Sequence, residues 1–158
     1  MKKLTLSLSN GVWEALTADA CAKKLDPGVH ANRILEDYLL KHGKIADTVT
    51  KDEIVLSREL IERAVLMAMK LGEKSLPPSI TFDVIQAVSA EKDWIEKYEK
   101  LVGDNPFKHG NPKKHTINQN LGYYIKKALG AGSATNADGS PMNVKVTGSI
   151  IQSYTPLK

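Results

Sequence analysis

The chain opens on an alternation of apolar and polar residues. Residues 4–8 read Leu-Thr-Leu-Ser-Leu, which would put the three leucines on one face of an extended strand. A strand this short does not stand alone, and no neighbouring segment has the pattern of a partner strand. The simplest partner is therefore the same strand of a second chain, paired antiparallel about a two-fold axis.

Two helices are predicted after this strand. Apolar residues at helical spacing follow an N-cap at Ser9 or Asn10 and indicate a helix that ends near Leu25. The sequence Asp26-Pro27-Gly28 breaks this helix and caps the next one, with proline at the favoured first helical position. The second helix carries an apolar stripe and ends at Gly43.

The rest of the chain is expected to form a separate domain. Its apolar spacing predicts helices over 54–71, from 89 to about 101 and from 116 to about 129, and short strands within 142–146 and 149–154. Residues 80–88 fit a short strand or a helix equally well. We therefore expect a domain over residues 1–43, a linker over 44–50 and a second domain over 51–158.

The order of the first elements resembles the ribbon-helix-helix (Arc/MetJ/CopG) superfamily of DNA-binding proteins. The resemblance covers residues 2–43 and lies in the strand LTLSLS, the helix start NGVWEAL and the closing RILEDYLLKHG. It implies an intertwined β-α-α homodimer whose two-stranded ribbon enters the major groove of DNA. The fold class we expect is mainly α with short β (α+β), a ribbon-helix-helix followed by a small, mostly helical α+β domain.

The resemblance also implies which residues contact DNA. Side chains on the outer face of the ribbon would reach the base edges, and the amides that start the second helix would bind a phosphate. The implied DNA-binding residues are Lys2, Lys3, Thr5, Ser7, Gly28 and Val29. Members of the family usually have Ser or Thr near that helix start. Here Asp26 carries a negative charge and Pro27 lacks an N–H, so we expect a weaker phosphate contact.

A second DNA contact is a hypothesis for the region around residue 116. Basic residues precede a predicted helix there, and three amide side chains fall in its first turn, where they could pair with adenine. The residues concerned are Lys113, Lys114, Asn118, Gln119 and Asn120. The alternative is an ordinary polar surface beside a helix cap.

Charge and composition add only a little. Residues 104–158 hold seven lysines and two aspartates, a net charge of +5, whereas residues 1–103 carry a net charge of −1. This asymmetry suits a polyanionic partner but also an ordinary solvated surface. The single cysteine, Cys21, cannot form an intramolecular disulfide, fits a reducing compartment and is expected in a core. We expect a cytoplasmic protein without a membrane partner, since no apolar run is long enough to span a bilayer.

These observations favour a sequence-specific protein that binds double-stranded DNA as a homodimer, or as a higher oligomer on DNA. The leading hypothesis is a transcriptional repressor of a bacterial, plasmid or phage type. The alternatives are an antitoxin that autoregulates its operon and neutralises a toxin, and an accessory factor for plasmid partition or transfer. A protein partner bound through the C-terminal domain is a further expectation. No catalytic motif, cofactor motif or metal-ligand spacing is present, so we expect no enzyme, cofactor or metal.

Overall fold

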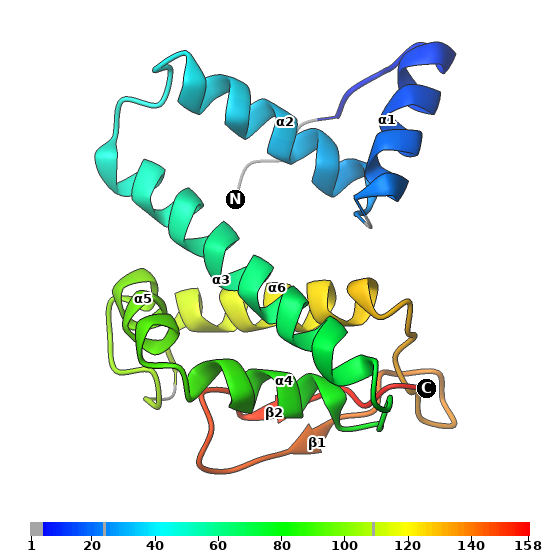
Figure 1. The fold of residues 1–158 in the computed structure, drawn as a ribbon, viewed down its shortest axis with the longest axis vertical. Coiled ribbons are helices and arrows are strands. Elements are labelled where there is room, and N and C mark those ends of the chain that lie inside the picture. Colours follow the sequence, from blue (N-terminus) through cyan, green and yellow to red (C-terminus); the bar gives the residue numbers. More distant parts are fainter. Residues whose placement is uncertain (1–4, 24, 109) are drawn as a thin grey trace. The chain divides into compact units, whose positions relative to one another are not determined.

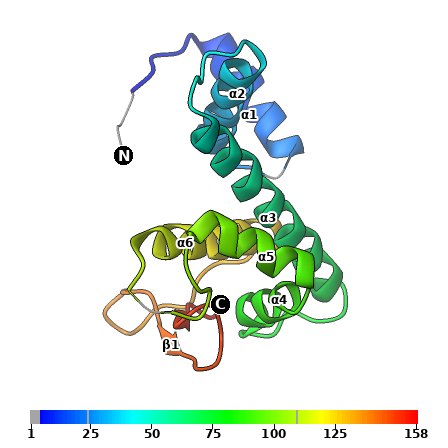
Figure 2. The ribbon, with the colours of Figure 1, turned by 90° about the vertical axis from the view of Figure 1, so that its left-hand side faces the viewer.

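The computed structural model of the chain describes residues 5–23, 25–108 and 110–158. Its internal contacts divide the chain into unit 1, Met1–Ala46, and unit 2, Asp47–Lys158, and each unit is described by itself. The described residues form six helices and one two-stranded sheet (Figures 1 and 2).

Unit 1 consists of two packed helices. α1 spans Asn10–Ala22, and α2 spans Pro27–Lys41. The Asp26 carboxylate caps α2 and Pro27 is its first residue, as the sequence predicts. In these two helices only Ala20 and His30 are buried, so unit 1 has almost no core of its own.

The predicted ribbon-helix-helix fold is wrong in this structure. Residues 5–9 form no regular element, and the only sheet among the described residues joins two strands near the C-terminus. Leu4, the first leucine of the alternation, lies outside the described residues. The physical reason is that a strand forms only when its N–H and C=O groups pair with another strand. No described segment of this chain supplies that partner.

Cys21 also departs from expectation. It lies on α1 and is exposed rather than buried. Free cysteines are commonly buried, but only Ala20 is buried in α1, so unit 1 offers little core to cover Cys21.

Unit 2 is built around its longest helix. α3 (Thr48–Gly72) contacts α4 (Ile80–Ser89), α5 (Lys92–Val102) and α6 (Pro112–Ala128). The ambiguous segment 80–88 is therefore helical. α3 begins earlier than the sequence predicts because the Asp47 carboxylate caps it by accepting from the amides of Val49 and Thr50.

The core of unit 2 is fixed by aromatic and aliphatic side chains from all four helices. Trp94 is completely buried, stacks on Tyr98 with ring centroids 5.3 Å apart, and donates from Nε1 to Leu60 O at 3.2 Å. The same core includes the hydrophobic residues Ile80, Val84, Ile85, Leu121 and Ile125.

The C-terminal segment packs back onto the helices of unit 2. β1 (Val144–Lys145) and β2 (Ser153–Tyr154) pair antiparallel, so the predicted pair of strands is confirmed, although each strand is only two residues long. Ile150 and Ile151 are buried, and Leu157 N donates to Pro78 O at 3.0 Å. These contacts hold the segment against the start of α4.

α6 begins at Pro112, four residues before the predicted helix start at residue 116. Asn111, and not Thr116, caps this helix, because its Oδ1 accepts from the amides of Lys113 and Lys114 and Pro112 occupies the first helical position. The basic residues predicted to precede the helix therefore belong to it. No helix among the described residues is both long and apolar enough to cross a membrane.

Candidate nucleic-acid interface

The predicted ribbon residues lie at the start of the described chain. Thr5 and Ser7 are exposed in the irregular segment that leads into α1. Lys2 and Lys3 lie outside the described residues. The hydroxyls of Thr5 and Ser7 are therefore accessible to a partner, but the structure holds them in no particular geometry toward one.

The two amides predicted to bind a phosphate already donate hydrogen bonds within the chain. Gly28 N and Val29 N donate to Asp26 Oδ1, at 2.9 and 3.3 Å. A phosphate at this helix start would have to displace the Asp26 carboxylate, which satisfies the same donors and carries the same sign of charge.

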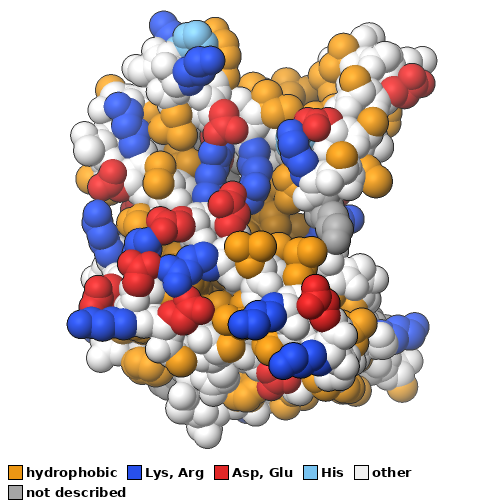
Figure 3. All heavy atoms as spheres, viewed as in Figure 1, with side chains coloured by type: hydrophobic (Ala, Val, Ile, Leu, Met, Phe, Trp, Pro, Cys, Tyr) orange, Lys and Arg blue, Asp and Glu red, His pale blue; other side chains and the backbone are white. Residues whose placement is uncertain are grey.

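Unit 1 exposes an unusual amount of apolar side chain for its size. On α2, Ile34 and Leu35 lie one turn before Tyr38 and Leu39, and Val12 and Trp13 lie in the first turn of α1; all are more than a third exposed. Figure 3 shows hydrophobic side chains open on the surface over α1. We call Val12, Trp13, Ile34, Leu35, Tyr38 and Leu39 the apolar face of unit 1.

The residues of the predicted second DNA contact have different surroundings in the structure. Lys113 Nζ pairs with Glu53 Oε1 on α3 at 2.6 Å. Lys114 is buried and its Nζ donates to Lys108 O at 2.9 Å. Removal from water lowers the pKa of Lys114, since burial disfavours the charged form. Lys114 is therefore removed from any duplex surface, whereas Lys113 is exposed but paired with Glu53.

The three amides also differ in role. Asn118 fastens the C-terminal segment to the core, because its Oδ1 accepts from Tyr98 OH at 2.8 Å and its Nδ2 donates to Ile150 O at 3.2 Å. Gln119 and Asn120 are exposed on α6. The structure therefore leaves only these two amides accessible for a contact to a large partner.

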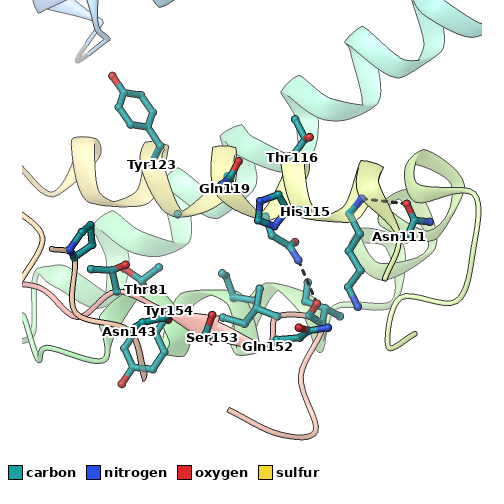
Figure 4. Close-up of a pocket in the computed structure, with 18 of the residues that line it drawn as sticks. Thr81, Asn111, His115, Thr116, Gln119, Tyr123, Asn143, Gln152, Ser153 and Tyr154 are labelled. Carbon is teal, nitrogen blue, oxygen red and sulfur yellow. Dashed lines mark hydrogen bonds between the residues drawn. The ribbon is translucent and has the colours of Figure 1, made fainter. Parts of the chain in front are cut away.

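Lys114, Asn118 and Gln119 come together along one groove of unit 2, whereas Lys113 and Asn120 do not line it. The groove runs between α6 and residues 150–155 and has a volume of about 1000 Å³ (Figure 4). Figure 4 shows Thr81, Asn143 and Tyr154 toward one end, His115 nearer the Asn111 end, and Gln152 and Ser153 opposite α6.

Sequence reasoning missed several lining residues of this groove. Lys126 was not among the predicted contact residues, although the series 114, 118, 122 and 126 has the spacing of four that places residues along one side of a helix. Thr81, Gln152 and Tyr154 come from other elements, and no local pattern links them to α6.

The charged side chains that line the groove are basic, and none is acidic. The lining includes Lys114, Lys126 and His115 but no aspartate or glutamate. Lys126 Nζ donates to Ser133 Oγ at 2.8 Å, and partial burial lowers the pKa of this lysine. Both lysines are thus desolvated without a carboxylate partner among the described residues, a state that an anion would relieve.

Comparisons with known proteins add no family. No family model, no curated protein and no solved structure matches the chain. Among the described residues, no group of three or more His, Cys, Asp and Glu side chains could hold a metal ion.

Proposed function

We propose that the chain is a homodimeric, sequence-specific DNA-binding protein that acts as a transcriptional repressor in the cytoplasm. In this proposal unit 1 joins the two copies and carries the contacts to double-stranded DNA, through side chains at its N-terminal end. The predicted β-ribbon is not part of the proposal.

The observation that carries the proposal is the apolar face of unit 1. Side chains such as Trp13, Leu35 and Tyr38 are 51%, 42% and 57% exposed, while only Ala20 and His30 are buried in α1 and α2. A helix pair with so little core gains stability by covering its apolar face. A second copy supplies a face of the same shape and chemistry, as two-fold association requires.

Dimerisation would also bring two identical N-terminal ends to one assembly. Thr5 and Ser7 are exposed there, and their hydroxyls can donate to or accept from base edges and phosphates. Residues 1–46 carry seven lysines and arginines and five acidic residues, a net charge of +2. A dimer would therefore carry twice this charge on its two copies of unit 1. A two-fold assembly of this kind suits a DNA site with two symmetric half-sites.

The antitoxin alternative gains no support from unit 2. Toxin-neutralising tails are commonly disordered before binding. Unit 2 instead encloses a core around Trp94 and Tyr98.

The proposal is tested by selecting bound duplexes from a random pool at a stated salt concentration, with the full chain. We expect an enriched site with two-fold symmetry, and a dimer by sedimentation at the same protein concentration. A Thr5→Ala, Ser7→Ala double variant should keep the dimer and lose sequence preference. A monomeric protein, or a pool without an enriched sequence, would show that the proposal is wrong.

A further inference from the structure

The groove of unit 2 contains a buried hydroxyl without a partner. Thr81 is 3% exposed and lines the groove, and its Oγ1 has no hydrogen-bond partner among the described residues. The carbonyls one helical turn earlier, Pro77 O and Pro78 O, already accept from Ile80 N and Leu157 N. Leaving a buried hydroxyl unsatisfied costs about 1–3 kcal/mol, which a hydrogen bond to a ligand would offset. Because Oγ1 is covered by its neighbours, the Thr81 side chain would have to turn toward the groove to donate to a ligand.

α6 leaves room beside this hydroxyl. Gly122 lies in the helix interior, where glycine is less stable than alanine by about 1 kcal/mol. A Cβ atom at residue 122 would lie 3.9 Å from Thr81 Cγ2, in ordinary contact, so packing does not demand glycine there. The missing side chain instead keeps the groove open next to Thr81.

The lining favours an anion. Lys126 lies one turn beyond Gly122 on the same side of α6, and Lys114 lies about 18 Å from Lys126 along the helix axis. The lining contains no carboxylate that could neutralise these ammonium groups. Lysine binds phosphate as a point charge, and a threonine hydroxyl can donate to one of the three phosphate oxygens.

The size of the groove indicates an organic molecule and not a bare ion. Its volume of about 1000 Å³ lies at the upper end of the range for small-molecule sites. The rest of the lining combines apolar side chains, such as Ile85 and Ile151, with polar ones, such as His115 and Asn143. This mixture suits a body that has both apolar and polar surface.

We propose that this groove binds an organic phosphate of nucleotide size, with its phosphate beside Lys126 and Thr81 and its body along α6 toward His115. Figure 4 shows Thr81 and His115 at different places along the groove. The same chemistry is offered by a free nucleotide and by one nucleotide of a single strand. The site lies wholly in unit 2 and does not depend on dimerisation or on duplex binding by unit 1.

The test uses isothermal titration calorimetry with the full chain and three probes: inorganic phosphate, a nucleoside 5′-monophosphate and a single-stranded pentanucleotide. We expect the monophosphate to bind more tightly than inorganic phosphate. Binding of the pentanucleotide but not the monophosphate would identify a strand as the source of the phosphate. Absence of binding by all three, or equal binding of inorganic phosphate and the monophosphate, would overturn the proposal.

Variants locate the site. Lys126→Gln should weaken binding about tenfold or more, because a hydrogen bond to a charged group is lost. Lys127→Gln, which removes an exposed neighbouring lysine that does not line the groove, is the matched control and should leave binding within about twofold. Equal losses in both variants would overturn the proposal.

Two further variants separate binding from folding. Gly122→Leu should fill the groove and abolish binding. Thr81→Val keeps the shape of the side chain but removes the hydroxyl, so binding should weaken while the thermal stability of the free protein stays equal or rises. Circular dichroism shows whether each variant folds. A Thr81→Val protein that binds as tightly as the wild type would overturn the role of this hydroxyl.

Discussion

His30 on α2 donates from Nε2 to Asp19 Oδ2 on α1 at 2.6 Å, and this bond ties together two helices that share almost no core. The His30 side chain is buried, whereas Asp19 is half exposed. The bond therefore combines the packing of a ring with a charge-assisted contact at the edge of unit 1.

We expect His30→Ala to destabilise unit 1 by about 1–3 kcal/mol, the range for loss of a buried, hydrogen-bonded side chain. Hydrogen exchange measured by mass spectrometry should show faster exchange in α1 and α2 and no change in unit 2. Lys44→Ala is the control, because Lys44 is exposed and follows the end of α2. Unchanged protection of α1 in His30→Ala would contradict this account.

The same carboxylate gives unit 1 an acid-sensitive contact. Hydrogen bonds from Lys23 and then from His30 lower the pKa of Asp19 below its ordinary value of 3.8. A depressed folded-state pKa means that the stabilisation is present above the unfolded value and is lost as the pH falls through the folded value. We expect α1 and α2 to lose protection below pH 3.8, and Asp19→Asn to remove this part of the pH dependence. An identical acid profile in both proteins would contradict the prediction.

Self-association should depend on the apolar face of unit 1. Leu35→Glu places a charge where the proposed dimer excludes water, so we expect a monomer by sedimentation under conditions in which the wild type is a dimer. Leu66→Glu is the control, since Leu66 is 66% exposed on α3 in unit 2 and lies outside this face. If the Leu35→Glu variant remained a dimer, or if both variants were monomers, the apolar face of unit 1 would not be the specific surface of association.

Helices were the part of the fold that the sequence predicted best. Proline and glycine positions and apolar spacing predicted both helices of unit 1, and the Asp26 cap was predicted correctly. The prediction of an N-terminal strand was wrong because alternation shows only which side chains could share one face of a strand. The hydrogen bonds that make a strand come from a partner, which the described residues do not contain.

The site was harder to predict than the fold. Lys114, Asn118 and Gln119 do line the groove, but the sequence did not show that Lys114 is buried or that Asn118 is held between Tyr98 and Ile150. Those partners are distant in sequence and belong to tertiary packing. Thr81 lies 41 positions before Gly122, and only the packing of α4 against α6 brings them together.

Glycine positions give a sharp test of helix packing. Gly122→Ala should stabilise unit 2 by up to about 1 kcal/mol, because alanine favours the helix and its Cβ meets only an ordinary contact. Gly103→Ala should instead destabilise it by about 1 kcal/mol, since Gly103 ends α5 with a φ of +73°. Urea unfolding of both variants checks the signs. Equal changes in the free energy of unfolding in the two variants would contradict the conclusion that residue 122 can hold a side chain without strain.

The buried hydroxyl of Tyr98 should make unit 2 sensitive to alkali. Tyr98→Phe leaves Asn118 Oδ1 without its donor, so we expect a loss of about 1–2 kcal/mol near neutral pH. Burial raises the pKa of Tyr98 above its ordinary value of 10.0, although the hydrogen bond to Asn118 opposes this shift. Above pH 10.0 the unfolded chain loses this proton while the folded chain keeps it, so stability falls as the pH rises.

The difference between the two proteins should therefore narrow from about pH 9 to about pH 11, because phenylalanine has no proton to lose. Lysines, including Lys114 and Lys126, are present in both proteins, so their titration cancels in the comparison. Urea unfolding followed by Trp94 emission, in a Trp13→Phe background that removes the other tryptophan, measures the difference in unit 2 alone. A difference that stays constant with pH would show that Tyr98 ionises as readily in the folded chain as in the unfolded one.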